Sequence, residues 1–156
     1  MKNLLPFIIP FLLLSCQKKV NLDHERTLIQ DILKQERTYH FENNTEGFVS
    51  LMADTITAVK NGIVNRYSHA DMKARFDPYF GSVKFIRWDD KIPPVIEISD
   101  DGSMAYAVVR KEVLLTYPDT IGRTLYDTTH YAWMAIYRKI NGEWKGVANA
   151  STEIPK

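Results

Sequence analysis

The chain has 156 residues, with 20 Lys and Arg against 19 Asp and Glu, and it contains one cysteine. Its length predicts a single domain that buries about two-thirds of the surface of the unfolded chain. A formal net charge of +1 provides no basic excess for binding nucleic acid, and one thiol excludes an internal disulfide or a zinc site built from several cysteines.

The first fifteen residues predict a targeting segment. Lys2 precedes LLPFIIPFLLLS, which is apolar up to its last residue. This run has the length of the apolar part of a signal peptide and is shorter than the roughly 20 residues that a transmembrane helix needs. The letters LLSC, which end at Cys16, resemble the bacterial lipobox, and in that motif cleavage falls before the cysteine. Residues 1–15 are therefore expected to be a lipoprotein signal peptide.

Acylation of Cys16 would anchor the protein in the bacterial cell envelope, at the outer membrane or at the periplasmic face of a membrane. Residues 16–22 then form the lipidated cysteine and a polar tether, in which Lys18 and Lys19 would lie beside anionic headgroups. A sulfur that carries a lipid is not available for catalysis or metal binding. The alternative is an ordinary signal peptide followed by an incidental cysteine.

Residues 23–156 are expected to form one domain that begins with helices. Residues 23–41 carry an apolar stripe on which Glu36 also falls, whereas His40 is expected on the solvent side of this helix. Residues 45–53 predict a short second helix. The front of the domain is therefore helical.

A hairpin and a third helix follow. Residues 55–60 and 63–67 flank an Asn-Gly pair, the dipeptide favoured in type I′ turns. Ser68 is expected to cap a helix whose apolar residues recur every four positions, and Pro78 and Gly81 are expected to end it.

The rest of the chain predicts strands. They alternate in character or are rich in β-branched and aromatic residues, and they cover residues 82–88, 94–98, 103–117, 125–139 and 144–151. In the first of them, alternation separates Phe85 from Trp88 and puts them on opposite faces. Helices ahead of a long antiparallel meander predict an α+β fold.

Four stretches in this order resemble the nuclear transport factor 2-like superfamily, also called cystatin-like, which includes the SnoaL-like cyclases and ketosteroid isomerases. They are NNTEGFVSLMADTITAV, the NG hairpin leading into SHADMKARF, DDGSMAYAVVR, and YRKINGEWKGVANAS. The resemblance covers residues 23–153. It implies a curved antiparallel sheet wrapped around the N-terminal helices as a cone with a cavity, and dimerisation through the open sheet face. It implies no single activity, because a fold does not determine function.

Three residues are candidates for acid–base chemistry. Asp54 follows the second predicted helix, where it could point into the mouth of a cavity, although an Asp there is more often a cap or turn residue. Tyr106 shares a strand face with Met104 and Val108, and that face could line a cavity or pack in a core. His130 has an unperturbed pKa near 6.5, and neither face of its strand is plainly polar. The alternative for His130 is a structural or surface histidine.

The candidate ligand contacts are Tyr106, His130, Asn149, Trp88 and Trp133. Asn149 lies in the last strand, where related enzymes and binders often carry a histidine, and an amide cannot shuttle a proton. Plain packing is the alternative for both tryptophans. The histidines are scattered without metal-ligand spacing and no phosphate-binding glycine motif is present, so neither a metal nor a cofactor is expected.

These observations leave three interpretations. The favoured one is a lipid-anchored domain that binds a small apolar or amphipathic molecule, or a protein partner, without catalysis. The second is an enzyme of the ketosteroid isomerase, dehydratase or cyclase kind that uses His130 or Asp54 as base and Tyr106 as donor. The third is a structural interaction module whose cone is filled by its own side chains. The expected partners are the membrane, a small ligand and a second copy of the chain, with no nucleic acid.

Overall fold

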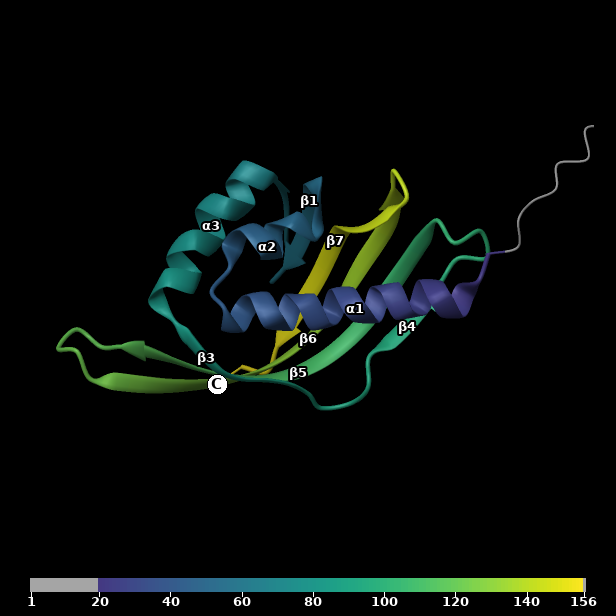
Figure 1. Ribbon diagram of the computed structural model, residues 1–156. Coiled ribbons are helices and arrows are strands. Elements are labelled where there is room, and N and C mark those ends of the chain that lie inside the picture. The colour runs from purple at the N-terminus through teal and green to yellow at the C-terminus, as the bar shows by residue number, and fades with distance from the viewer. Residues whose placement is uncertain (1–19, 156) are drawn as a thin grey trace, which may run out of the picture.

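The structure is a computed structural model that describes residues 20–155 (Figure 1). The predicted signal peptide and lipidated Cys16 lie outside the described residues, as does most of the tether. Within residues 20–155, no helix is long and apolar enough to cross a bilayer.

The three predicted helices are present, with small changes at their ends. They are α1 (Leu22–Phe41), α2 (Thr45–Ser50) and α3 (His69–Ser82). Ser68 and Asp71 form the predicted capping box at the start of α3. The prediction that Pro78 ends this helix is wrong, because α3 continues through it to Ser82. A proline one turn from a helix end removes a single backbone hydrogen bond, and the buried Phe80 beyond it stabilises the last turn.

Seven strands form one sheet. They are β1 (Met52–Lys60), β2 (Ile63–Ser68), β3 (Lys84–Asp90), β4 (Val95–Ile98), β5 (Met104–Pro118), β6 (Thr124–Ile140) and β7 (Glu143–Glu153). The strand order is β2-β1-β7-β6-β5-β3, and β4 pairs with the same edge of β5 as β3. Both Asn-Gly turns have positive φ at their two central residues, as a type I′ turn requires.

The sheet is antiparallel except for the pair β1 and β7, which is parallel. Both strands start beside the end of α2, where the Gly146 amide donates to the Leu51 carbonyl at 2.9 Å. The α+β architecture predicted from the sequence is confirmed: the curved sheet wraps around the helices, and α1 lies across its inner face (Figure 1). The distal ends of β5 and β6 extend past the helices as a two-stranded arm.

Strand alternation decides which residues face the helices. On β5 the buried side chains are odd-numbered, including Ala107, Val109 and Val113, and their partners on β6 include the half-buried Trp133. A bulge in β3 between Phe85 and Arg87 breaks the alternation there. Phe85 and Trp88 therefore both face inward, which corrects the prediction that they lie on opposite faces.

One buried carboxylate ties α1 to the sheet. Glu25 is buried on the inner side of α1, and the Trp144 indole N–H donates to it at 2.7 Å. The Lys139 ammonium lies 2.6 Å from its other oxygen. A buried charge with an opposite charge and a hydrogen-bond donor is compensated, so this contact orients α1 on β6 and β7.

Candidate binding site

A cleft of about 490 Å³ opens on the inner side of the sheet, between the end of α3 and the distal halves of β5 and β6. Its apolar walls include Val83, Val113 and Leu115. Its polar side chains are Tyr79, Ser82, Tyr117, Asp127, Thr129 and Tyr131. The volume of this cleft lies in the range of small-molecule sites, and the cleft is open to solvent.

The polar groups of the cleft are three phenols, two aliphatic hydroxyls and one carboxylate. Desolvation raises the pKa of Tyr79 to about 12, and the neighbouring Tyr131 and Asp127 add to the shift. The Tyr79 phenol is therefore protonated at neutral pH and can donate a hydrogen bond to a ligand. Asp127 is the one acidic residue of the lining.

Aromatic rings fill the cone behind the cleft. Trp88 packs on His40 with ring centroids 3.9 Å apart, and on Phe85 at 5.6 Å. His40 also makes edge contacts with Phe48 and Phe80. The expectation that His40 lies on the helix surface is wrong, because its side chain is the centre of this cluster and is buried.

A charged pair joins β5 to the edge strand β3, and its lysine is buried while its aspartate is partly exposed. Lys111 is only 2% exposed, and its ammonium contacts the Asp90 carboxylate. The two residues are direct neighbours in the strand pairing. The same ammonium lies 6.0 Å above the Trp133 ring, which adds a cation–π contact.

Two titratable groups of α1 face this interior one helical turn apart. The ring Nδ1 of His40 lies 2.6 Å from the Glu36 carbonyl, so Nδ1 carries the proton and donates to it. Burial lowers the pKa of His40 to about 4, with the hydrogen bond to Glu36 acting in the opposite direction and the Lys111 charge in the same direction as burial. Burial also raises the pKa of the Glu36 carboxyl to about 7, with a smaller opposing effect of Lys111.

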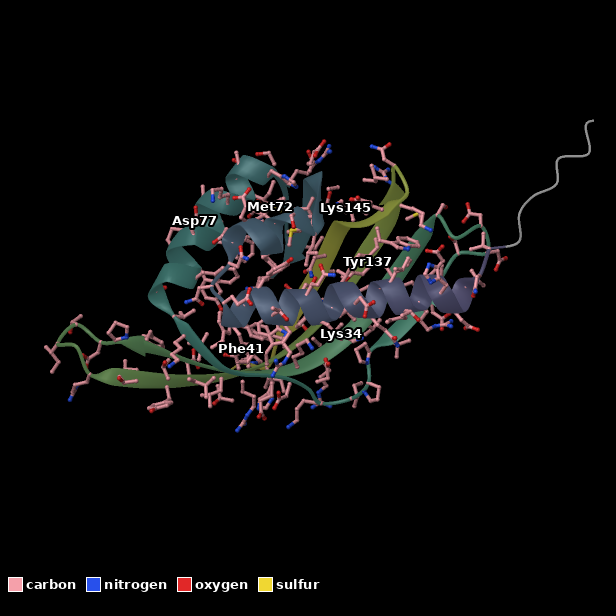
Figure 2. The ribbon with its side chains drawn as sticks, viewed as in Figure 1. Lys34, Phe41, Met72, Asp77, Tyr137 and Lys145 are labelled. Atoms are coloured by element: carbon pink, nitrogen blue, oxygen red, sulfur yellow. The ribbon has the colours of Figure 1, made fainter. Side chains whose placement is uncertain are left out.

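Two interior donors have no hydrogen-bond partner within residues 20–155. They are the hydroxyl of Tyr137 and the indole Nε1 of Trp88. Tyr137 is 1% exposed and packs in the cluster beneath α1 (Figure 2), and Trp88 is 9% exposed. Burial raises the pKa of Tyr137 well above its usual value, and the Glu36 charge adds to the shift. A buried donor without a partner is costly, so both atoms mark places where a polar group would be stabilised.

The structure places Tyr106 and His130 away from the cleft. Tyr106 is 38% exposed on the open face of the sheet, and the even-numbered residues of β6, His130 among them, share that face. The His130 Nδ1 lies 3.8 Å from Glu112, which also contacts Arg87 and Lys91. Both faces of β6 carry apolar and aromatic residues, so alternation alone does not indicate which face meets the helices.

The other predicted site residues divide between surface and interior. Asp54 is exposed on β1, three strands from β5 in the sheet, which is about 14 Å at the usual strand spacing. Asn149 pairs with the buried Ala135 and therefore shares the inner face. Trp88 and Trp133 are both inside, with ring centroids 6.1 Å apart. Thus the two tryptophans are brought together, but the three acid–base candidates are not brought to them.

The sequence did not indicate that His40, Lys111 and Tyr137 are buried. It placed Glu36 on the apolar stripe of the first helix without indicating a functional role. A signal was present in α1, where Glu25, Ile29, Glu36 and His40 recur at helical spacing on the inner side. Lys111 carries no such signal, because a lysine among apolar strand residues is usually solvent-exposed. Within residues 20–155, no group of His, Cys, Asp and Glu could hold a metal ion.

No family model and no curated protein matches the sequence, whereas solved structures match it closely in shape. A candidate dehydratase of the NTF2-like family from Streptomyces avermitilis has a TM-score of 0.70 at 11% identity, over 86% of this chain and 99% of its own. A ketosteroid isomerase-like protein from Erwinia carotovora atroseptica has a TM-score of 0.68 at 14% identity, over 86% and 99%.

A third similar structure is a candidate Ca/calmodulin-dependent kinase II association domain from Exiguobacterium sibiricum. Its TM-score is 0.67 at 16% identity, over 89% of this chain and 98% of its own. The three neighbours differ in the activities that their names state. The protein therefore has the NTF2-like fold, and its function has to be argued from its own side chains.

Proposed function

We propose that the domain binds a small amphipathic molecule in the cleft between α3 and the distal ends of β5 and β6, without chemical turnover. The observation that carries this proposal is the cleft itself, which combines an apolar floor at Val113 and Leu115 with phenol and carboxylate groups. The predicted base and donor, His130 and Tyr106, lie on the other face of the sheet. General acid–base catalysis needs both groups within hydrogen-bond reach of one substrate.

A fluorescent amphipathic probe, 1-anilinonaphthalene-8-sulfonate, tests this proposal. Thr129 lines the cleft, and its neighbour Thr128 points to the open face of the sheet. We expect Thr129→Trp to fill the cleft and to weaken probe binding at least tenfold, since it removes the space for the ring system, whereas Thr128→Trp leaves it within about twofold. Equal binding by both variants would place the probe elsewhere, and no binding by the parent chain would favour a structural module with a filled cone.

An enzyme is the second candidate, because one interior pair has suitable chemistry. The Glu36 carboxyl has a pKa of about 7, and its charge adds to the effect of burial in raising the pKa of the Tyr137 hydroxyl. A carboxyl poised near neutrality and a phenol donor are the groups that proton transfer next to a carbonyl requires. Isomerisation of a β,γ-unsaturated ketone by the parent chain, lost in Glu36→Gln, would establish catalysis. Its absence in the parent chain would support binding alone.

We further propose that Cys16 is acylated and anchors the protein in the bacterial cell envelope. The support comes from the apolar run and the LLSC motif. The membrane fraction and metabolic labelling with a palmitate analogue provide the test. Cys16→Ala should lose the label and leave the membrane, and a variant that remains labelled and membrane-bound would contradict the anchor.

A second copy of the chain is the proposed partner of the open sheet face. Strand pairing aligns a row of apolar side chains across five strands of that face, namely Val95, Val108, Met134, Ala150 and Val59. Of these, Met134 is 42% exposed in the single chain, so association would bury it. Light scattering should report a dimer for the parent chain and a monomer for Met134→Lys.

A further inference from the structure

The cleft between α3 and the distal halves of β5 and β6 holds one charged side chain, the carboxylate of Asp127. Neither a lysine nor an arginine nor a histidine is among the described residues that line it. A hollow whose charge is negative attracts a cation and disfavours an anion. The charge of the lining therefore favours a ligand with a positive end.

Strand register places Asp127 between two phenols of the cleft. Asp127 is the strand partner of Leu115, and the next position of β5 on the same face, toward the tip of the arm, is Tyr117. In the other direction, Tyr131 lies four residues along β6, which is about 13 Å. Tyr79 lines the cleft from α3, and the effects of both Asp127 and Tyr131 in raising its pKa agree with a position beside them. Phenols from α3, β5 and β6 therefore share the cleft with this carboxylate.

Phenol rings and carboxylates are both groups that bind ammonium ions. The face of an aromatic ring attracts a cation, and a carboxylate accepts charge-assisted hydrogen bonds from ammonium N–H groups. The Tyr131 ring already makes the first of these interactions, because the Lys60 ammonium lies 5.7 Å from its centroid. Tyr79 and Tyr117 are exposed where they line the cleft, so their rings are accessible to a ligand.

Two lysines lie near Tyr131, at the inner end of the cleft, and both are paired with carboxylates. The Lys60 ammonium lies 3.1 Å from Glu153, and Lys111, the strand partner of Tyr131, contacts Asp90. Neither lysine lines the cleft. Their positive charges are therefore compensated, and the cleft keeps the negative charge of its own carboxylate.

We propose that the cleft binds an amphipathic amine whose protonated nitrogen pairs with the Asp127 carboxylate. The apolar part of the ligand covers Val113 and Leu115, and the rings of Tyr79 and Tyr117 contact its charged end. A primary ammonium group has three N–H donors, and hydroxyl oxygens of the cleft accept those that the carboxylate leaves. This inference rests on the proposed binding function and specifies its ligand class.

Isothermal titration with decylammonium chloride tests the proposal on a chain that begins at Gln17, which keeps every helix and strand of the fold. Decanoate is the comparison ligand, since it has a chain of similar length and an anionic end. We expect the parent chain to bind decylammonium at least tenfold more tightly than decanoate. Asp127→Asn should weaken decylammonium about tenfold, because it removes the opposite charge, and should not weaken decanoate. Asp100→Asn removes the same charge in the turn before β5 and is the matched control, for which we expect no change.

The aromatic contact has its own pair of variants in the arm. Tyr117 lines the cleft, whereas Tyr126 is exposed on the opposite face of the same two strands. Tyr117→Leu should weaken decylammonium about threefold, since a cation–π contact at an exposed site contributes modestly, and Tyr126→Leu should leave the affinity unchanged. Equal affinities of the two variants would overturn the part assigned to the Tyr117 ring.

The outcomes separate this inference from the function on which it rests. Equal affinities for decylammonium and decanoate would overturn the amine class, as would an unchanged decylammonium affinity in an Asp127→Asn variant that circular dichroism shows to be folded. Binding of the anilinonaphthalene probe would in either case leave the cleft as a binding site. Decylammonium binding that persists in Thr129→Trp would place the amine outside the cleft and would also overturn the proposal. Failure of all three ligands to bind the parent chain would overturn the binding function itself.

Discussion

Glu36 and His40 lie one turn apart on α1, and burial moves their pKa values in opposite directions. The Glu36 value rises to about 7 and the His40 value falls to about 4, because desolvation favours the neutral form of each group. The folded chain therefore binds a proton at Glu36 more tightly than the unfolded chain does. It binds a proton at His40 less tightly. The two residues then make stability depend on pH with opposite signs.

Replacing Glu36 by Gln should raise stability at alkaline pH. The stability that neutral Glu36 contributes is present below its ordinary pKa of 4.5 and is lost as the pH rises to about 7, after which the buried carboxylate is a constant cost. Glu36→Gln removes this cost, which we place at about 3 kcal/mol. Urea unfolding should show the variant more stable than the parent at pH 8 and nearly equal at pH 4. An equal difference at both pH values would show that the carboxyl does not titrate in this range.

The ion pair between Lys111 and Asp90 joins β5 to the edge strand β3. The ammonium is buried and the carboxylate is partly exposed. Removing only the carboxylate leaves a buried positive charge, whereas replacing the lysine by an apolar residue of similar length leaves an exposed acid. The two substitutions at this one contact should therefore have unequal effects.

We expect Asp90→Ala to cost about 3 kcal/mol and Lys111→Met to cost less than about 1 kcal/mol. Midpoints of urea unfolding at neutral pH provide the measurement. Asp89→Ala is the control, because Asp89 is exposed and lies 3.8 Å from Arg87, a surface pair whose removal should change stability by less than about 0.5 kcal/mol. A larger loss in Lys111→Met than in Asp90→Ala would show that the aliphatic stem and the cation–π contact of Lys111 contribute more than the ion pair does.

The whole molecule is elongated, and the start of the domain lies at the end opposite the arm (Figure 1). Val20 packs against Gly102 in the turn before β5, where a Cβ on the glycine would come within 2.6 Å of a Val20 methyl group. Nine residues of β5 separate this end from the cleft, from Met104 to Val113, which is about 30 Å along the strand. The tether between Cys16 and Val20 reaches at most about 14 Å. A lipid at Cys16 would therefore hold the Gly102 end close to the bilayer and leave the cleft at the distal end.

Energy transfer to a rhodamine lipid in vesicles of phosphatidylethanolamine and phosphatidylglycerol measures this orientation. With Cys16 acylated, a new cysteine is the single free thiol, since the chain has no other. A fluorophore on Asp100→Cys, in the turn beside Val20, should transfer strongly, and one on Thr120→Cys, at the tip of the arm, should transfer weakly. Equal transfer from both positions would show that the domain lies flat, and failure to bind the vesicles would contradict the anchor instead.

Local interactions explain why the helices, turns and strands could be predicted from the sequence. The helices, the capping box at Ser68, the two Asn-Gly turns and the long strands all follow from contacts between residues a few positions apart, and the α+β order follows from their succession. The two tryptophans expected at an interior site, Trp88 and Trp133, are also found inside the cone. These features need no knowledge of how the sheet is arranged.

Packing between residues far apart in the chain determines which face of the sheet meets the helices. Both faces of β5 and β6 carry apolar residues. The alternation of side chains along a strand therefore does not indicate whether Tyr106 and His130, or instead Lys111 and Tyr137, face the helices. The bulge in β3 and the position of α1 settle the choice, because they depend on packing between residues far apart in the chain. The interior positions of Glu36, Trp88, Lys111 and Tyr137 have the same cause, because these residues belong to four different elements and no local pattern indicates which of them face inward.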